Sequence, residues 1–182
     1  SMGGMIAQTL AIDFPDRVLS LVSIMSTTGR RSVGWQDPRL LPQLVAGGRA
    51  SRADFVERSV RSWGAIASPD YPVPPADIKA RAAETYDRGI DQAGLVRQLQ
   101  AVVAQPDRSR ALQQLAIPAL VIHGTRDRLI HSSGGRATAQ AIPNAELLLI
   151  PGMGHDLPRE LWPVVADGIE RTARRAQVEA VS

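Results

Sequence analysis

Three side chains that could together perform acyl transfer occur in the order serine, aspartate, histidine. Ser1 opens the chain in the run SMGG, which matches the second half of the G-x-S-x-G turn that presents a nucleophilic serine between a strand and a helix. Asp127 follows the run HGTR, and His155 follows PGMG. In such a set the histidine takes the serine proton, while the carboxylate orients the imidazole and stabilises its charged form. The residue types and their order therefore predict a serine hydrolase.

Each of these residues also has an ordinary explanation. An N-terminal serine is commonly solvated, and Ser1 could be a residue added in cloning before a start at Met2. Aspartate is common in turns, so Asp127 alone could be a turn residue, and His155 alone could be a loop histidine. The surrounding motifs favour the catalytic interpretation at all three positions.

The elements predicted around these residues bring two of them to one edge of a sheet. Short apolar runs predict strands, and apolar residues at helical spacing predict helices. The strands are expected at 18–25, 119–122 and 146–150, and the helices at 3–14, 134–141 and 159–176. This alternation indicates an α/β fold with a mostly parallel sheet flanked by helices. Because Asp127 and His155 each follow a strand, we expect both at its carboxyl edge.

The segment between the first two strands has a different character. It is rich in arginine, aspartate and proline and has helical patches but no strand signal, at 38–46, 52–63, 75–90 and 92–104. A proline-rich loop at 68–75 divides these patches into two pairs. We therefore predict a core at 1–29 and 106–182 with a helical insertion at 30–105.

Composition narrows the classes of function. The 182 residues carry a net charge of +3, and Lys79 is the only lysine. Arginines and acids are interleaved, which is typical of a solvated surface rather than a nucleic-acid-binding face. No apolar run reaches the ~18 residues that a membrane-spanning helix needs. The absence of cysteine excludes a thiolate nucleophile and favours a cytoplasmic protein.

The histidines give no indication of a metal site. His123, His131 and His155 lack the paired spacing of metal ligands, so neither a metal nor another cofactor is expected. We expect His123, at the end of a strand, to be a hydrogen-bonded structural residue and His131 to lie on the surface.

With these motifs in place, the chain resembles the α/β-hydrolase family, and most closely its actinobacterial members of the aclacinomycin methylesterase type. The resemblance is carried by SMGGMIAQTLA at the start, VIHGTRD in the middle and PGMGHDLP near the end. It covers the whole chain, which is similar to the C-terminal two-thirds of such a hydrolase. The resemblance implies a cofactor-free hydrolase of small to medium apolar esters that works through an acyl-enzyme.

The resemblance also implies roles for individual residues. Ser1 would be the nucleophile, Asp127 the orienting acid and His155 the general base, and the backbone N–H of Met2 would be one oxyanion-hole donor. The insertion would be a cap over the substrate pocket. Candidates for substrate contact are Trp35, Tyr71 and Met153; for Trp35 and Tyr71, packing between helices is the alternative.

Departures from the family pattern leave other functions open. The N-terminal strands of the family and the loop with the second oxyanion donor have no counterpart in this sequence. The chain could therefore be a catalytically inactive fragment, or a partner that completes a sheet with another polypeptide or with a second copy. A third possibility is an N-terminal-nucleophile hydrolase, in which the α-amino group of Ser1 is the base.

Overall fold

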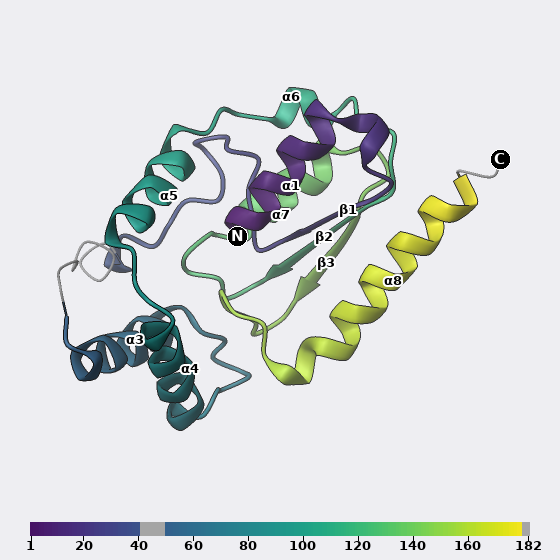
Figure 1. Cartoon of the computed structure of the whole chain (residues 1–182). Coiled ribbons are helices and arrows are strands. Elements are labelled where there is room, and N and C mark those ends of the chain that lie inside the picture. Colours follow the sequence, from purple (N-terminus) through teal and green to yellow (C-terminus); the bar gives the residue numbers. More distant parts are fainter. Residues whose placement is uncertain (41–49, 180–182) are drawn as a thin grey trace.

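Three parallel strands form the centre of the protein. The computed structural model describes residues 1–40 and 50–179. The strands β1 (Leu21–Ile24), β2 (Ala119–Gly124) and β3 (Glu146–Ile150) lie in the order β1-β2-β3 (Figure 1). In the register, Ile24 lies opposite Ile122, and Gly124 lies opposite Ile150. All three strands therefore end at the same edge of the sheet.

Helices cover both faces of this sheet. Helices α1 (Met2–Asp13) and α7 (Ser133–Ala141) pack on one face, and α8 (Trp162–Glu179) packs on the other (Figure 1). The alternation of side chains along β2 explains the two layers, because Ala119 faces the first cluster of core residues and Leu120 and Ile122 face the second. The α/β architecture predicted from the sequence is confirmed.

Short elements complete the core. They are α6 (Ser109–Leu112) and three turns of 3₁₀ helix, η1 (Pro15–Arg17), η2 (Pro38–Leu40) and η3 (Arg159–Leu161). The predicted strand at 18–25 is shorter in the structure, and the predicted helix at 159–176 begins with η3. Most of the helical patch predicted at 38–46 lies outside the described residues.

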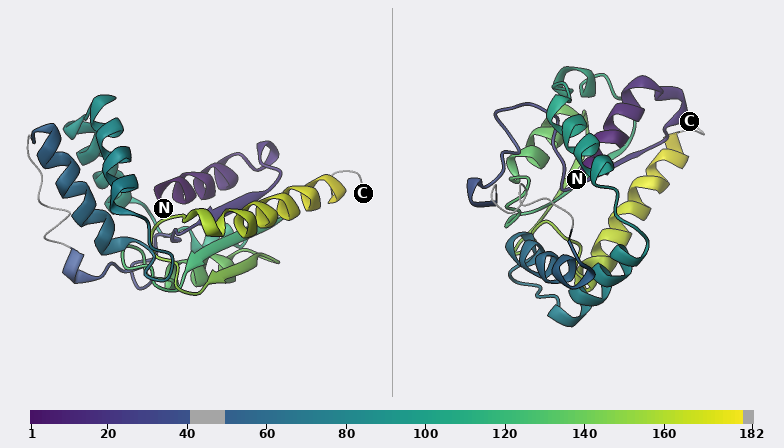
Figure 2. Two further views of the ribbon diagram at one scale, coloured as in Figure 1. Left: turned by 90° about the horizontal axis from the view of Figure 1, so that it is seen from below. Right: turned by 60° about the vertical axis from the view of Figure 1, so that its left-hand side comes forward.

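Three helices lie beyond the carboxyl edge of the sheet, as Figure 2 shows. They are α3 (Arg52–Ile66), α4 (Pro75–Asp87) and α5 (Gln92–Ala104). Helix α3 begins where the Ser51 side chain accepts a hydrogen bond from the Asp54 N–H, which caps the helix. Helices α3 and α4 pack on each other, so the proline-rich loop joins a packed pair rather than separating two pairs. No helix within 1–40 and 50–179 is long and apolar enough to cross a membrane.

Candidate active site

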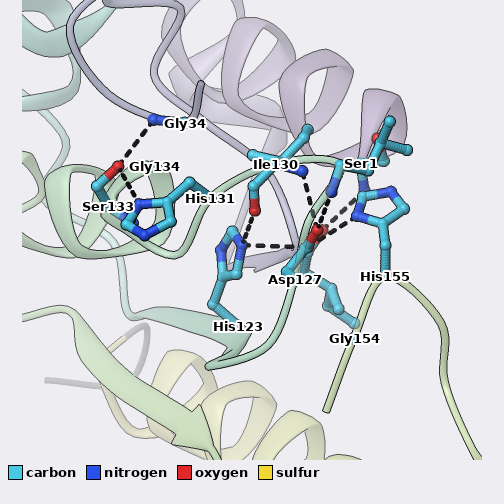
Figure 3. A network of polar contacts seen from close by, with 12 residues as sticks. Ser1, Gly34, His123, Asp127, Ile130, His131, Ser133, Gly134, Gly154 and His155 are labelled. Carbon is cyan, nitrogen blue, oxygen red and sulfur yellow. Dashed lines mark hydrogen bonds and ion pairs between the residues drawn. The ribbon is translucent and has the colours of Figure 1, made fainter. Parts of the chain in front are cut away.

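The loops after β2 and β3 bring Asp127 and His155 together at the carboxyl edge of the sheet (Figure 3). Nδ1 of His155 lies 2.8 Å from Oδ2 of Asp127. Both residues are buried, because His155 is 7% exposed and Asp127 is 4% exposed. Because the carboxylate is an acceptor, Nδ1 carries the proton, and Nε2 of the neutral ring is free to accept one. The pair therefore has the tautomer that a general base needs.

Asp127 is held by hydrogen bonds to both oxygens. Oδ1 accepts from the backbone N–H groups of Leu129 at 2.9 Å and Ile130 at 2.8 Å, while Oδ2 faces His155. Burial alone would raise the pKa of Asp127, but hydrogen bonds from His123, His155 and Ile130 outweigh it and lower the pKa from 3.8 to about 2. The carboxylate is thus charged at neutral pH, and the stability it contributes is present above about pH 4 and is lost as the pH falls further.

His123 supports Asp127 from the other side. Its Nε2 lies 2.8 Å from the carbonyl oxygen of Ile130 and 3.3 Å from Oδ2 of Asp127. Two acceptors around Nε2 place the proton there, whereas the buried Nδ1 has no hydrogen-bond partner among the described residues. His123 is fully buried and is structural and hydrogen-bonded, as predicted, and one of its two partners is the catalytic candidate Asp127.

Backbone hydrogen bonds join the loop that carries Asp127 to the loop that carries His155. The backbone N–H of Arg126 donates to the Met153 carbonyl at 2.9 Å, and that of Thr125 donates to Ile150 at 3.0 Å. At Gly124 the chains approach so closely that a methyl group there would overlap the Met153 carbonyl. This glycine therefore allows the approach that sets the distance between Asp127 and His155.

Ser1 directly precedes α1 and lies at the end of β1, on the side of the site where Figure 3 shows His155. The nitrogen of Ser1 donates to the Ile24 carbonyl at 2.8 Å. Gly4 lets the helix approach the sheet, because a Cβ there would lie 2.6 Å from the Cβ of Ser26. Farther along α1, Gln8 donates to Ser23 of β1 at 3.1 Å. Ser1 is thus anchored by its own backbone and by the packing of its helix.

A cavity of about 550 Å³ opens at Ser1. Its wall is largely apolar and comes from α1, from the loop after β1, from α5 and from the loop after Asp127; it includes Met5, Val33, Trp35, Leu99, Val103 and Ile130. Leu99 and Val103 are more than half exposed and lie on the face of α5 that borders this cavity. The cavity suits an apolar ligand group next to Ser1.

A larger cavity of about 930 Å³ lies between α3, the loop at 35–39 and the loop that carries Asp127. Asp127 lines this larger cavity and Ser1 lines only the smaller one, while His155 lines neither; Trp35 borders both. His131, which was expected on the surface, is partly buried. Its ring stacks on Trp35 with ring centres 4.1 Å apart.

Comparison with known proteins decides the family. Residues 1–158 match the model of the α/β-hydrolase fold. The chain belongs to the α/β-hydrolase family. This confirms the resemblance seen in the three sequence motifs.

Named relatives of this α/β-hydrolase include two methylesterases. The chain is 27% identical to a pimeloyl-[acyl-carrier protein] methyl ester esterase of Chromobacterium violaceum, over 85% of this chain and 60% of that protein. It is 26% identical to a rhodomycin D methylesterase of Streptomyces, over 98% of this chain and 66% of that protein. The chain thus spans about two-thirds or less of the length of these relatives.

A solved structure with the same fold is the enol-lactonase of Burkholderia xenovorans. Its TM-score is 0.67 at 20% identity, and the match covers 98% of this chain and 63% of the lactonase. At this level of identity the likeness concerns the fold alone.

Two predicted contact residues of this α/β-hydrolase lie away from Ser1. Met153 is fully buried in the core cluster with Leu120 and Ile122, and Tyr71 packs against the same cluster. Neither lines either of the two cavities described above; Met153 is fully buried, whereas Tyr71 is partly buried. Of the three candidates for substrate contact, only Trp35 lines the cavity at Ser1.

Across residues 1–40 and 50–179, no three histidine, aspartate or glutamate side chains are arranged to hold a metal ion.

The start of α1 offers a backbone donor. Met2 is the first residue of α1, so its N–H is one that a helix leaves without an intrahelical acceptor. Such a group can bind a developing oxyanion.

Proposed function

We propose that the protein is a serine esterase in which Ser1, Asp127 and His155 act as a catalytic triad. The observation that carries the proposal is the buried His155–Asp127 pair at 2.8 Å, at the same edge as the start of α1. In the first step Oγ of Ser1 attacks the ester carbonyl and passes its proton to Nε2 of His155. The alcohol leaves with that proton, and an acyl-enzyme on Ser1 remains.

In the second step the same groups hydrolyse the acyl-enzyme. His155 takes a proton from water, the hydroxide attacks the acyl carbonyl, and the proton returns to Oγ of Ser1. The N–H of Met2 stabilises the oxyanion in both steps, and the cavity lined by α5 holds the apolar part of the ester. The named methylesterase relatives support an ester as the substrate, and we propose one of small to medium size. The segment 30–105 is proposed as the cap.

We expect replacement of Ser1 with alanine to abolish ester turnover. The assay follows release of p-nitrophenol from p-nitrophenyl butyrate, in which the wild-type protein gives a burst followed by steady turnover. The matched control is Ser132→Ala, because Ser132 precedes α7 and its side chain makes no capping hydrogen bond. Turnover by Ser1→Ala at the rate of the control would refute the proposal.

An N-terminal-nucleophile mechanism is favoured by one observation. Burial lowers the pKa of the Ser1 α-amino group from 8.0 to about 6, although Asp127 opposes the shift, so most of the amine is neutral at pH 7 and could act as a base. In a longer polypeptide the same nitrogen would be a peptide N–H. Acetylation of the amine separates the two mechanisms, because an amide nitrogen cannot act as a base while the triad keeps His155.

A role as a sheet-completing partner is favoured by exposed apolar side chains. Ile6, Leu10 and Phe14 of α1 are about half exposed or more, and within the described residues β1 pairs only with β2. An apolar face of this kind favours association. Elution as a monomer at micromolar concentration would argue against this candidate.

A further inference from the structure

The loop that carries His155 is bound to the end of helix α3 by consecutive contacts. The backbone N–H of Gly154 donates to Oγ of Ser68 at 2.8 Å, and the N–H of His155 donates to the Ile66 carbonyl at 2.7 Å. Oδ1 of Asp156 then accepts from both the N–H of Ser68 at 2.9 Å and its hydroxyl at 2.5 Å. Three successive residues of the loop thus bind the last residue of α3 and the turn after it.

These contacts are buried. Ser68 is 3% exposed and Asp156 9% exposed. A charge-assisted hydrogen bond to a buried carboxylate is stronger than a neutral one, and a buried donor that loses its partner is costly. The Ser68 hydroxyl both donates to Asp156 and accepts from Gly154, so its removal would leave both groups without that partner.

The two segments also leave no space between them. A Cβ on Gly154 would lie 2.5 Å from backbone atoms of Ile66 and Ala67, so only glycine permits this approach. Gly152, with a φ of +73°, lies against the side chain of Asp70. The loop therefore cannot shift toward α3, and the hydrogen bonds prevent it from shifting away.

We propose that Ser68 and Asp156 are positioning residues for His155. They hold the loop so that Nδ1 of His155 stays aligned with Oδ2 of Asp127, and they make this alignment depend on the position of α3. The inference rests on the proposed esterase function for its kinetic consequence. Its structural part, the alignment of the His155–Asp127 pair by Ser68, is measurable without turnover.

The test uses Ser68→Ala, with Ser59→Ala as the matched control. Ser59 lies in α3 and its hydroxyl donates to the Phe55 carbonyl within the same helix, so the same atom is removed without touching the His155 loop. We expect the amide protons of Gly154 and His155 to exchange with solvent about tenfold or more faster in Ser68→Ala, with no change for amides of β2. The low-field NMR signal of the His155 Nδ1–H should broaden or disappear only in this variant.

Kinetics provide the second measurement. Because a misplacement of about 1 Å can cost a hundredfold in rate, we expect kcat to fall about tenfold to a hundredfold in Ser68→Ala with KM nearly unchanged. Ser68→Thr, which keeps the hydroxyl, should recover most of the lost rate. A general loss of stability would not give this division between kcat and KM or this recovery.

The outcomes separate the two proposals. If the wild-type protein shows no ester turnover but Ser68→Ala speeds exchange at Gly154 and His155, the esterase function fails and the positioning role stands. If turnover is present and Ser68→Ala leaves exchange, the Nδ1–H signal and kcat unchanged, the positioning role is overturned. Should Ser68→Ala not fold, Asp156→Asn replaces it, and unchanged exchange of the His155 amide there overturns the role equally.

Discussion

Replacement of Asp127 with asparagine is expected to lower kcat for ester hydrolysis about ten-thousandfold while the fold is retained. The reason lies in the hydrogen bonds of each oxygen. Oδ1 accepts from the N–H groups of Leu129 and Ile130, so the amide oxygen of asparagine would take this place. The amide nitrogen would then face Nδ1 of His155. It would force the ring proton onto Nε2, where it prevents His155 from accepting the serine proton.

Two measurements check this result. The first is kcat/KM with an activated ester, compared with Asp87→Asn, in which an exposed carboxylate that pairs with Arg52 loses its charge. We expect that control to stay within about twofold of the wild type, because exposed ion pairs contribute little. The second is the ¹⁵N shift of the His155 ring, which reports its tautomer. Wild-type turnover in Asp127→Asn would exclude Asp127 as the orienting acid.

Replacement of Gly124 with alanine is expected to destabilise the protein by about 3 kcal/mol or more and to abolish activity. The new methyl group would overlap the Met153 carbonyl, a backbone atom that cannot rotate away. That carbonyl also accepts the hydrogen bond from Arg126, so relief of the overlap would separate the loops of Asp127 and His155. Stability and catalysis should therefore be lost together.

The measurement is the free energy of unfolding from denaturant titration, with Gly64→Ala as the matched control. Gly64 lies inside α3, and a Cβ there would meet no atom within 4 Å. Because alanine favours a helix more than glycine does, this control should be more stable by about 0.5–1 kcal/mol. A Gly124→Ala protein with wild-type stability would show that the two loops are not in close backbone contact.

Local sequence patterns were sufficient to predict the parts of the site that follow strands. The apolar runs before Asp127 and His155 identified β2 and β3, and parallel strands end at one edge, so both side chains were expected there. Their approach to 2.8 Å is in line with that expectation. The spacing of apolar residues after Ser1 predicted a helix at 3–14, and α1 spans Met2–Asp13.

Contacts between segments far apart in the sequence were not predictable in this way. The hydrogen bond between Ser68 and Asp156 joins residues 88 positions apart, and neither residue type signals its partner. The burial of Met153 was not predictable, because nearness to His155 along the chain says nothing about the direction of its side chain. The hydrogen bond from His123 to Asp127 was missed for a related reason, since periodicity indicates a buried histidine but not the acceptor it finds.

The most direct test of the central claim is labelling of the protein with a fluorophosphonate, followed by intact mass measurement and mapping of the adduct. We predict one adduct, on Oγ of Ser1, which is lost in His155→Ala because the hydroxyl then has no base to take its proton. An adduct on Ser1 that forms equally fast in His155→Ala, or no adduct on Ser1 in the wild-type protein, would contradict the assignment of Ser1, Asp127 and His155 as a catalytic triad.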